Sequence, residues 1–332
     1  MLNKVLGRRV AGLVCGTVMA AMIAPLATSS AFAGKISIGH TIWVGYGPLY
    51  LARELGYFKE NGVDVDFQVV DDSALAMAAQ AAGKLDGTAT TVDEILKYRS
   101  DNFCFKAVAV FDESHGGDGM VSLDSIKGLP DLKGKTVALN EGSTSQFWFS
   151  YLLKKQGIPL KDVTVLNMSA DAAAAAFIAG QVPVAVTWEP NLTLVKTKKV
   201  GKVLMDSAAT PGVIVDVLEI SCKVLEERPN DVKGFVAALQ KAVDYIKTNP
   251  DKAYAIMAKG VGGYLKEPKD FADAASGVKF YDKPMTISYL GTKEKPGQIA
   301  DVIKLGNEIW SDLGKMKTTI DYHAVIDPGF TQ

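Results

Sequence analysis

Residues 72–90 read DSALAMAAQAAGKLDGTAT, and residues 169–187, 97 positions further along the chain, read SADAAAAAFIAGQVPVAVT. Each stretch opens with a polar residue that can cap a helix, continues through alanines and reaches a glycine that stops the helix. A one-turn link and a short strand follow in both copies. Alanine-rich helices are common, so chance similarity is one explanation. The other is a chain with two similar α/β lobes.

The residues around the first copy alternate between strand-like and helical patterns. Strands are predicted at 35–39, 63–70, 107–111 and 136–140, and helices at 48–61, closed by Gly62, and at 73–82, capped by Ser73. Such alternation is typical of α/β architecture with largely parallel sheets. Ligands of open α/β sheets bind beyond the carboxyl ends of the strands. Two lobes facing each other there form a clamshell.

The first 33 residues have the order of a secretory signal peptide. Lys4, Arg8 and Arg9 give a basic start, residues 10–27 are apolar and uncharged, and residues 31–33 are Ala-Phe-Ala before Gly34. We expect cleavage after Ala33 and a periplasmic protein. An uncleaved membrane anchor is the alternative, because 18 apolar residues are just long enough to span a bilayer.

Composition excludes several classes of protein. The formal net charge is −1 for the whole chain, and cleavage would leave 33 basic and 37 acidic groups, a balance of −4. Neither net charge shows the excess of basic residues that is typical of nucleic-acid-binding proteins. The three histidines are scattered, no zinc or Walker motif is present, and Ser143 has no nucleophile-elbow context. We therefore expect no metal, no cofactor and no enzyme activity.

The expected mature chain keeps two cysteines, Cys104 and Cys222, and both lie in segments that resemble strands. Export would place them in an oxidising compartment, where they can pair. Two buried, unreactive thiols are the alternative.

Four stretches carry a family resemblance. They read YGPLYLARELGYF at 46–58, GVDV at 62–65, LKGKTV at 132–137 and AVTWEP at 185–190. In this order and spacing, behind a signal peptide, the chain resembles the nitrate, sulfonate and taurine group of periplasmic binding proteins. That group also includes relatives of the yeast pyrimidine-synthesis protein. The resemblance covers essentially the whole expected mature chain.

The resemblance implies a type II periplasmic binding protein fold, with two Rossmann-like lobes, a cleft between them and two hinge crossings. Residues 34–120 and 217–332 would form lobe I, and residues 121–216 would form lobe II. It also implies a monomer that captures a small-molecule solute and passes it to the permease and ATPase subunits of an inner-membrane ABC importer.

Family position and local chemistry together nominate twelve ligand-binding candidates in loops at strand ends. Trp43 and Tyr46 offer aromatic walls or, alternatively, core packing. Asp72 and Ser73 open a helix, so capping is their competing role. Asp216 precedes a crossing and can serve the hinge instead. The full set is Trp43, Tyr46, Asp72, Ser73, Thr91, Glu94, Asp112, Ser143, Thr144, Trp188, Glu189 and Asp216.

The charge of these loops predicts the ligand. Seven acids, Asp72, Glu94, Asp112, Glu113, Glu141, Glu189 and Asp216, stand in them without Arg or Lys. Such a set favours a cation or a zwitterion, so we expect an amine, a guanidine-like compound or a taurine-like solute. Alkyl sulfonates and nitrate are the alternatives. Because seven clustered acids are costly unless paired or protonated, several should point to solvent.

Two functions of another class stay open at this point. One is an enzyme of pyrimidine-precursor synthesis on the same fold, although the cysteine-rich stretch of those relatives is absent here. The other is a sensor ectodomain that reports its ligand to a membrane partner.

Overall fold

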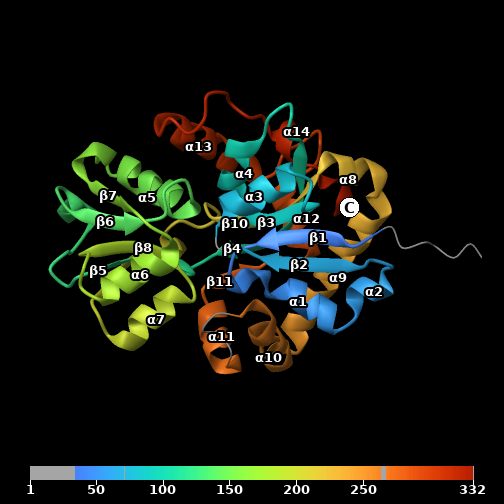
Figure 1. Cartoon of the computed structure of the whole chain (residues 1–332), viewed down its shortest axis with the longest axis horizontal. Helices are drawn as coiled ribbons and strands as arrows, with labels where there is room; N and C mark the ends of the chain where they lie inside the picture. Colours follow the sequence, from blue (N-terminus) through green and yellow to red (C-terminus); the bar gives the residue numbers. More distant parts are fainter. Residues whose placement is uncertain (1–33, 71, 263–266, 332) are drawn as a thin grey trace, which may run out of the picture. The chain divides into compact units, whose positions relative to one another are not determined.

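The computed structural model describes residues 34–70, 72–262 and 267–331, so the predicted signal peptide lies outside the described residues. It contains two mixed β-sheets, each flanked by helices (Figure 1). The first has the order β11 (Val278–Phe280), β4 (Phe105–Ser114), β10 (Val215–Ser221), β3 (Gly87–Thr91), β1 (Ile36–His40), β2 (Val65–Val69). The second has the order β7 (Thr164–Asn167), β6 (Thr136–Leu139), β8 (Val184–Trp188), β5 (Asp118–Ser122), β9 (Lys202–Asp206).

Helices connect the strands and form most of the C-terminal region. Before β10 they are α1 (Gly47–Glu54), α2 (Tyr57–Glu60), α3 (Ser73–Ala81), α4 (Val92–Tyr98), α5 (Thr144–Lys155), α6 (Ala170–Ile178) and α7 (Asn191–Lys198). After β10 they are α8 (Cys222–Glu227), α9 (Pro229–Thr248), α10 (Pro250–Val261), α11 (Pro268–Ala275), α12 (Lys283–Leu290), α13 (Ile299–Asp312) and α14 (Tyr322–Val325). Among the described residues, no helix has the length and apolar character needed to cross a membrane.

The two sheets repeat one topology. In the first, β1 pairs in parallel with β2 on one side and β3 on the other, and α3 precedes β3. In the second, β6 pairs in parallel with β7 and β8, and α6 precedes β8. The two alanine-rich stretches therefore occupy equivalent places in two similar lobes, which chance similarity does not explain.

Two details of the predicted helices are wrong. The stretch 48–61 forms two helices, α1 and α2, because Gly56 between them adopts a left-handed backbone at φ 77°. The cap of α3 is Asp72, whose carboxylate accepts from the Ala74 amide at 2.7 Å, and Ser73 is the first helical residue. In both cases the helix is placed correctly and its boundary is decided by a local backbone angle or side-chain bond.

The expectation of largely parallel sheets is also wrong at one internal strand of each sheet. Strand β10 runs antiparallel to β3 and β4, and β5 runs antiparallel to β8 and β9. The reason is topological. Each of these strands enters from the other lobe, at the edge where the parallel strands end, and must therefore run in the opposite direction.

Two short segments cross between the lobes, residues 115–117 after β4 and residues 207–214 before β10. They are tied to each other, because the hydroxyl of Ser207 lies 2.8 Å from that of Ser114 and accepts from the Gly116 amide at 2.7 Å. The boundaries predicted at 120/121 and 216/217 fall inside β5 and β10. We propose the same two lobes with their boundaries in the crossing segments.

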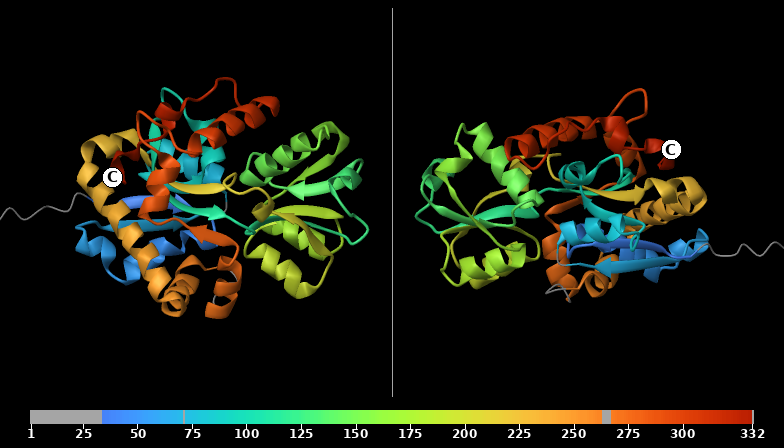
Figure 2. Two further views of the ribbon diagram at one scale, coloured as in Figure 1. Left: turned by 180° about the vertical axis from the view of Figure 1, so that it is seen from behind. Right: turned by 45° about the horizontal axis from the view of Figure 1, so that its top comes forward.

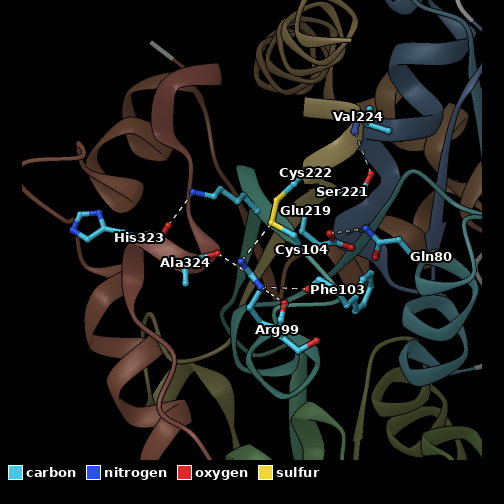
Figure 3. Close-up of a disulfide and its surroundings, with 12 residues drawn as sticks. Gln80, Arg99, Phe103, Cys104, Glu219, Ser221, Cys222, Val224, His323 and Ala324 are labelled. Atoms are coloured by element: carbon cyan, nitrogen blue, oxygen red, sulfur yellow. Dashed lines mark hydrogen bonds between the residues drawn. A yellow bond between two sulfur atoms is a disulfide. The ribbon is translucent and has the colours of Figure 1, made fainter. Parts of the chain in front are cut away.

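A disulfide joins Cys104 and Cys222 and closes a loop with a sequence separation of 118. It lies at the ends of β4 and β10 away from the crossings, and the Cys222 amide also donates to the Cys104 carbonyl at 2.9 Å (Figure 3). The open question about the two cysteines is thus answered in favour of pairing. The loop contains all of the second sheet. The disulfide therefore joins β4 and β10, the two strands that lead into lobe II and back from it.

The apolar core of lobe I forms mainly between the first sheet and helices α1, α9 and α10. A second apolar cluster lies near α4 and α13 and includes Phe147, which belongs to α5 of lobe II. The rings of Phe147 and Trp310 have centroids 6.0 Å apart. Figure 2 shows α5 beside α13 from two further directions. The lobes therefore share apolar packing as well as their two crossings.

Glu219 is a fully buried carboxyl in β10, near the disulfide (Figure 3). It accepts hydrogen bonds from the Thr88 hydroxyl at 2.6 Å and the Gln80 amide at 2.9 Å. Burial raises the pKa of Glu219 to about 7, and the two hydrogen bonds offset part of that effect. The folded protein therefore holds a proton there at pH values at which the unfolded chain has released it.

We predict that Glu219→Gln removes part of the pH dependence of stability. A raised folded-state pKa means that the stabilisation is complete below the unfolded value of 4.5 and is lost as pH rises towards about 7. At pH 8 the variant should exceed the natural protein by about 1–3 kcal/mol in free energy of unfolding, with little difference at pH 4.5. Urea unfolding at both pH values checks this. The exposed Glu226→Gln is the control, and an equal effect of the two substitutions would contradict the assignment.

Candidate functional site

A cavity of about 50 Å³ lies between the two lobes. Ten of the twelve predicted residues line it: Trp43, Tyr46, Asp72, Ser73, Thr91, Glu94, Ser143, Thr144, Trp188 and Asp216. They come from the ends of β1, β3 and β8, from the starts of α3 and α5, from α4 and from β10. The carboxyl edges of the parallel strands of both sheets thus meet at one place, as the clamshell interpretation predicts.

Trp43 forms one wall and is held by a buried carboxyl behind it. Its indole N–H donates to both oxygens of Asp112, at 3.2 and 3.3 Å. A side chain at Gly45 would collide with that carboxylate and with the indole nitrogen, and one at Gly117 would collide with the far edge of the indole ring. Both glycines are therefore needed for the close packing around Trp43. Asp112 itself does not line the cavity, so its role is to position the aromatic wall.

Tyr46 forms a second wall, and its hydroxyl donates to Asp216. Asp216 lies directly opposite Asp112 in the register of β10 and β4. Two carboxyls on neighbouring strands thus each accept a hydrogen bond from an aromatic residue that follows β1. Asp216, unlike Asp112, also lines the cavity.

Direct hydrogen bonds join the lobes around the cavity. Glu94 accepts from the Thr90 hydroxyl at 2.6 Å and from the Thr144 amide of lobe II at 3.2 Å. The hydroxyls of Thr91 and Thr144 lie 2.6 Å apart. Another such bond joins Asn140 Nδ2 to Asp72 Oδ2 at 3.0 Å. Both oxygens of Asp72 are thus engaged, one by the helix it caps and one by the other lobe, and Glu94 joins the two lobes through Thr144.

Glu189 lies outside the cavity. Its carboxylate accepts from the Thr193 amide at 2.9 Å in the first turn of α7 and faces Lys196 at 3.7 Å. Its negative charge therefore lies at the N-terminus of α7, where a carboxylate commonly stabilises a helix. The position after β8 predicted its neighbourhood, but the direction of the side chain was not visible in the sequence.

Five residues that line the cavity are absent from the predicted set: Thr41, Thr90, Asp118, Asn140 and Ile214. Thr90 and Asn140 stand at strand ends, so the same positional signal pointed to them. Asp118 is the first residue of β5, an antiparallel strand that begins at the cleft. It was missed because candidates were sought where parallel strands end. Ile214 belongs to the second crossing segment, residues 207–214, and an apolar side chain there gives no sign of a ligand site.

The expectation that several of the seven acids point to solvent is wrong. Only Glu141 is exposed, Asp72 is half-buried and the other five are buried. Burial raises the pKa of Asp118 to about 7. Burial, the neighbouring carboxyls and the apolar surroundings hold the pKa of Asp112 and Asp216 well above the usual range, although Trp43 and Tyr46 offset this in part. The cost of burying these acids is therefore reduced by protonation and hydrogen bonding, and not by contact with water.

No lysine or arginine lines the cavity among the described residues. The ammonium of Lys97 lies near its edge but donates to the Gly142 carbonyl and sits over the Trp310 ring, 4.3 Å from the centroid. Within the described part of the chain, no group of three His, Cys, Asp or Glu side chains is arranged to hold a metal ion. The cavity thus offers carboxyls, hydroxyls and aromatic rings.

The architecture is that of the periplasmic binding proteins. The structure superposes on the periplasmic aliphatic sulphonate binding protein SsuA of Escherichia coli with a TM-score of 0.72 and 16% sequence identity, covering 90% of this chain and 99% of that one. A match at this identity shows the shared fold: two α/β lobes, a cleft and two crossings.

The chain belongs to the NMT1/THI5-like family, whose model matches residues 43–253. A Bacillus subtilis protein named for binding aliphatic sulfonates is 26% identical, over 82% of this chain and 79% of that protein. The taurine-binding periplasmic protein of Escherichia coli is 25% identical, over 83% and 86%. An Aspergillus parasiticus pyrimidine phosphate synthase is 25% identical over 63% of this chain. The family resemblance seen in the sequence is confirmed.

We predict that Trp43→Phe lowers the free energy of unfolding at neutral pH by about 1–3 kcal/mol, because it leaves the buried Asp112 without its donor. The phenyl ring keeps the aromatic wall. Trp188→Phe is the matched control, since the Trp188 indole N–H has no hydrogen-bond partner among the described residues. Urea unfolding of both variants measures the difference. Equal losses would mean that the hydrogen bond to Asp112 contributes nothing to stability.

Proposed function

We propose that this protein is an exported solute-binding protein of an ABC importer, which captures a small nitrogen-containing cation or zwitterion between its lobes. The observation that carries the proposal is the lining of the cavity: carboxyls and aromatic rings from both lobes, with no lysine or arginine among the described lining residues.

The sign of the charge is the first argument. Asp216 and Glu94 from lobe I and Asp118 from lobe II all line the cavity. A bound cation would compensate this cluster, whereas a bound anion would have to be balanced by added protons on the same acids. Asp216 is the best candidate for the counter-ion, because both oxygens of Glu94 already accept hydrogen bonds from protein groups.

The aromatic rings are the second argument. Trp43, Tyr46 and Trp188 contribute rings from both lobes. A cation over an aromatic face is attracted by the ring quadrupole, by roughly 2 kcal/mol or more where water is excluded. Trp188 comes from lobe II and packs against the apolar core of lobe I. Closure of the lobes would thus bring its ring to the ligand.

The size of the cavity is the third argument. A single water needs on the order of 10–15 Å³ of such space, and the cavity has about 50 Å³. It therefore suits a solute with a few non-hydrogen atoms, such as methylammonium or guanidinium.

Family membership supports the rest of the proposal. Relatives are named as periplasmic or ligand-binding proteins, one structural neighbour being the ligand-binding component of an ABC-type import system from Staphylococcus aureus. We propose the same setting here: cleavage after Ala33, a periplasmic monomer, and a permease and ATPase as partners. Ligand would favour the closed state through contacts that are better made there.

An alkyl sulfonate is the second candidate ligand, and the names of two relatives favour it. Backbone amides and hydroxyls at the starts of α3 and α5 are donors that such an anion can use. One relative is a synthase, but we propose a binding role because most of the named relatives are binding proteins.

We predict that guanidinium, methylammonium and taurine bind, and that ethanesulfonate and nitrate do not. Taurine and ethanesulfonate form a matched pair that differs only in the amine. A ligand at about 100 times its dissociation constant adds about 2.7 kcal/mol of stability, which a thermal-shift assay detects readily. The protein should first be refolded to remove any carried-over ligand.

Variants locate the binding. Asp216→Asn keeps an acceptor for Tyr46 but removes the charge, so cation affinity should fall at least about tenfold, or about 1.4 kcal/mol. Glu219→Gln alters a buried acid outside the cavity and should leave the affinity unchanged. If ethanesulfonate binds as tightly as taurine and both bare cations fail to bind, the sulfonate alternative replaces the proposal.

A further inference from the structure

Three carboxyls converge where the lobes meet. Asp112 and Asp216 face each other across β4 and β10, and Asp118 lines the same cavity from β5. Their exposed fractions are 0%, 3% and 5%. Bulk water therefore contributes little to balancing their charge, and any charge that appears there must be balanced by a proton or a ligand.

The groups around this cluster are mostly acidic. Tyr46 and Trp43 donate to Asp216 and Asp112 from the loop after β1. The other charged or titratable groups that act on the three acids are Asp93 and Glu94 from α4, Glu113 from β4 and Glu189 after β8. The nearby bases are engaged by other groups: Lys97 by Gly142, Lys196 by Glu189, and Lys279 and His115 by Glu113. The ring of His40 also lies 5.5 Å from that of Tyr46, centroid to centroid, and its two nitrogens contact the Thr41 carbonyl and the Tyr50 hydroxyl. Among the described residues, none of these bases forms an ion pair with Asp112, Asp118 or Asp216.

We propose that capture of a cation in this cavity releases at least one proton from the cluster of Asp112, Asp118 and Asp216, so that affinity rises with pH. This inference rests on the proposed function and adds a form of regulation to the same site. The charge balance is simple: a carboxylic acid loses its proton to solvent, and the carboxylate that remains pairs with the cation.

The direction of the effect follows from the state of the free protein. Burial raises the pKa of Asp118 to about 7 and holds that of Asp112 and Asp216 well above the usual range, so the empty cluster carries protons at neutral pH. A bound cation stabilises the ionised form and lowers its pKa. Between the bound and free values, binding becomes tighter as pH rises. An anion would show the opposite dependence, because it takes up protons on binding.

Guanidinium is the probe that tests this, because it stays fully charged across the range of interest. Its dissociation constant should be measured by calorimetry from about pH 5.5 to about pH 8.5 at constant ionic strength. Release of one proton gives up to about a tenfold gain in affinity per pH unit, levelling off above the free-protein pKa. Repeating the titration in buffers of different ionisation enthalpy counts the released protons directly.

Two variants separate the cluster from other buried acids. Asp118→Asn should reduce both the pH slope and the number of protons released. Glu219→Gln alters a buried acid with a similarly raised pKa that does not line the cavity. It should leave both quantities unchanged.

Each remaining outcome decides one proposal. If guanidinium binds with an affinity that does not vary with pH and with no proton release, proton coupling is refuted while the proposed function stands. If guanidinium, methylammonium and taurine all fail to bind even at the highest pH, the proposed function fails, and the inference fails with it. Tighter binding of nitrate or ethanesulfonate at low pH would identify the site as an anion site.

Discussion

Asp216 and Asp112 lie opposite each other on adjacent strands, and both are buried at the place where the two sheets meet. Two carboxyls so placed cannot both be ionised at low cost unless something positive or a donor compensates them. The compensation visible in the protein comes from the Tyr46 hydroxyl and the Trp43 indole. Because those two aromatic side chains are also walls of the cavity, the same constraint shapes the cavity and sets the charge of its lining.

The chain reaches this arrangement by crossing twice between its lobes. Each crossing delivers a strand that starts at the cleft, so Asp118 and Asp216 appear near the beginnings of β5 and β10. At the far ends of β4 and β10, the disulfide between Cys104 and Cys222 holds the two strands together. At the cleft end of the same strands, the hydroxyls of Ser114 and Ser207 tie the two crossings to each other.

Membership of the NMT1/THI5-like family defines the fold. The choice of ligand depends on the residues in the loops. Relatives are named for aliphatic sulfonates and for taurine, which share a sulfonate group. The cavity here is lined instead by carboxyls and aromatic rings. Loops at strand ends vary without disturbing the sheets beneath them, so one fold can carry cavities with different linings.

The sequence by itself determined the α/β class, the family and most of the lining, because helix periodicity, caps, strand ends and short motifs are local features. The repeated lobe was only one of two explanations of the sequence, and the topology of the two sheets established it. Tertiary structure decided what depends on distant partners. It set the antiparallel direction of β5 and β10, paired Cys104 with Cys222, turned Glu189 towards α7 and placed Asp112 behind Trp43. The direction of a side chain follows from packing and hydrogen bonds with distant residues, such as Tyr46 and Asp216, which lie 170 positions apart, and no local pattern encodes it.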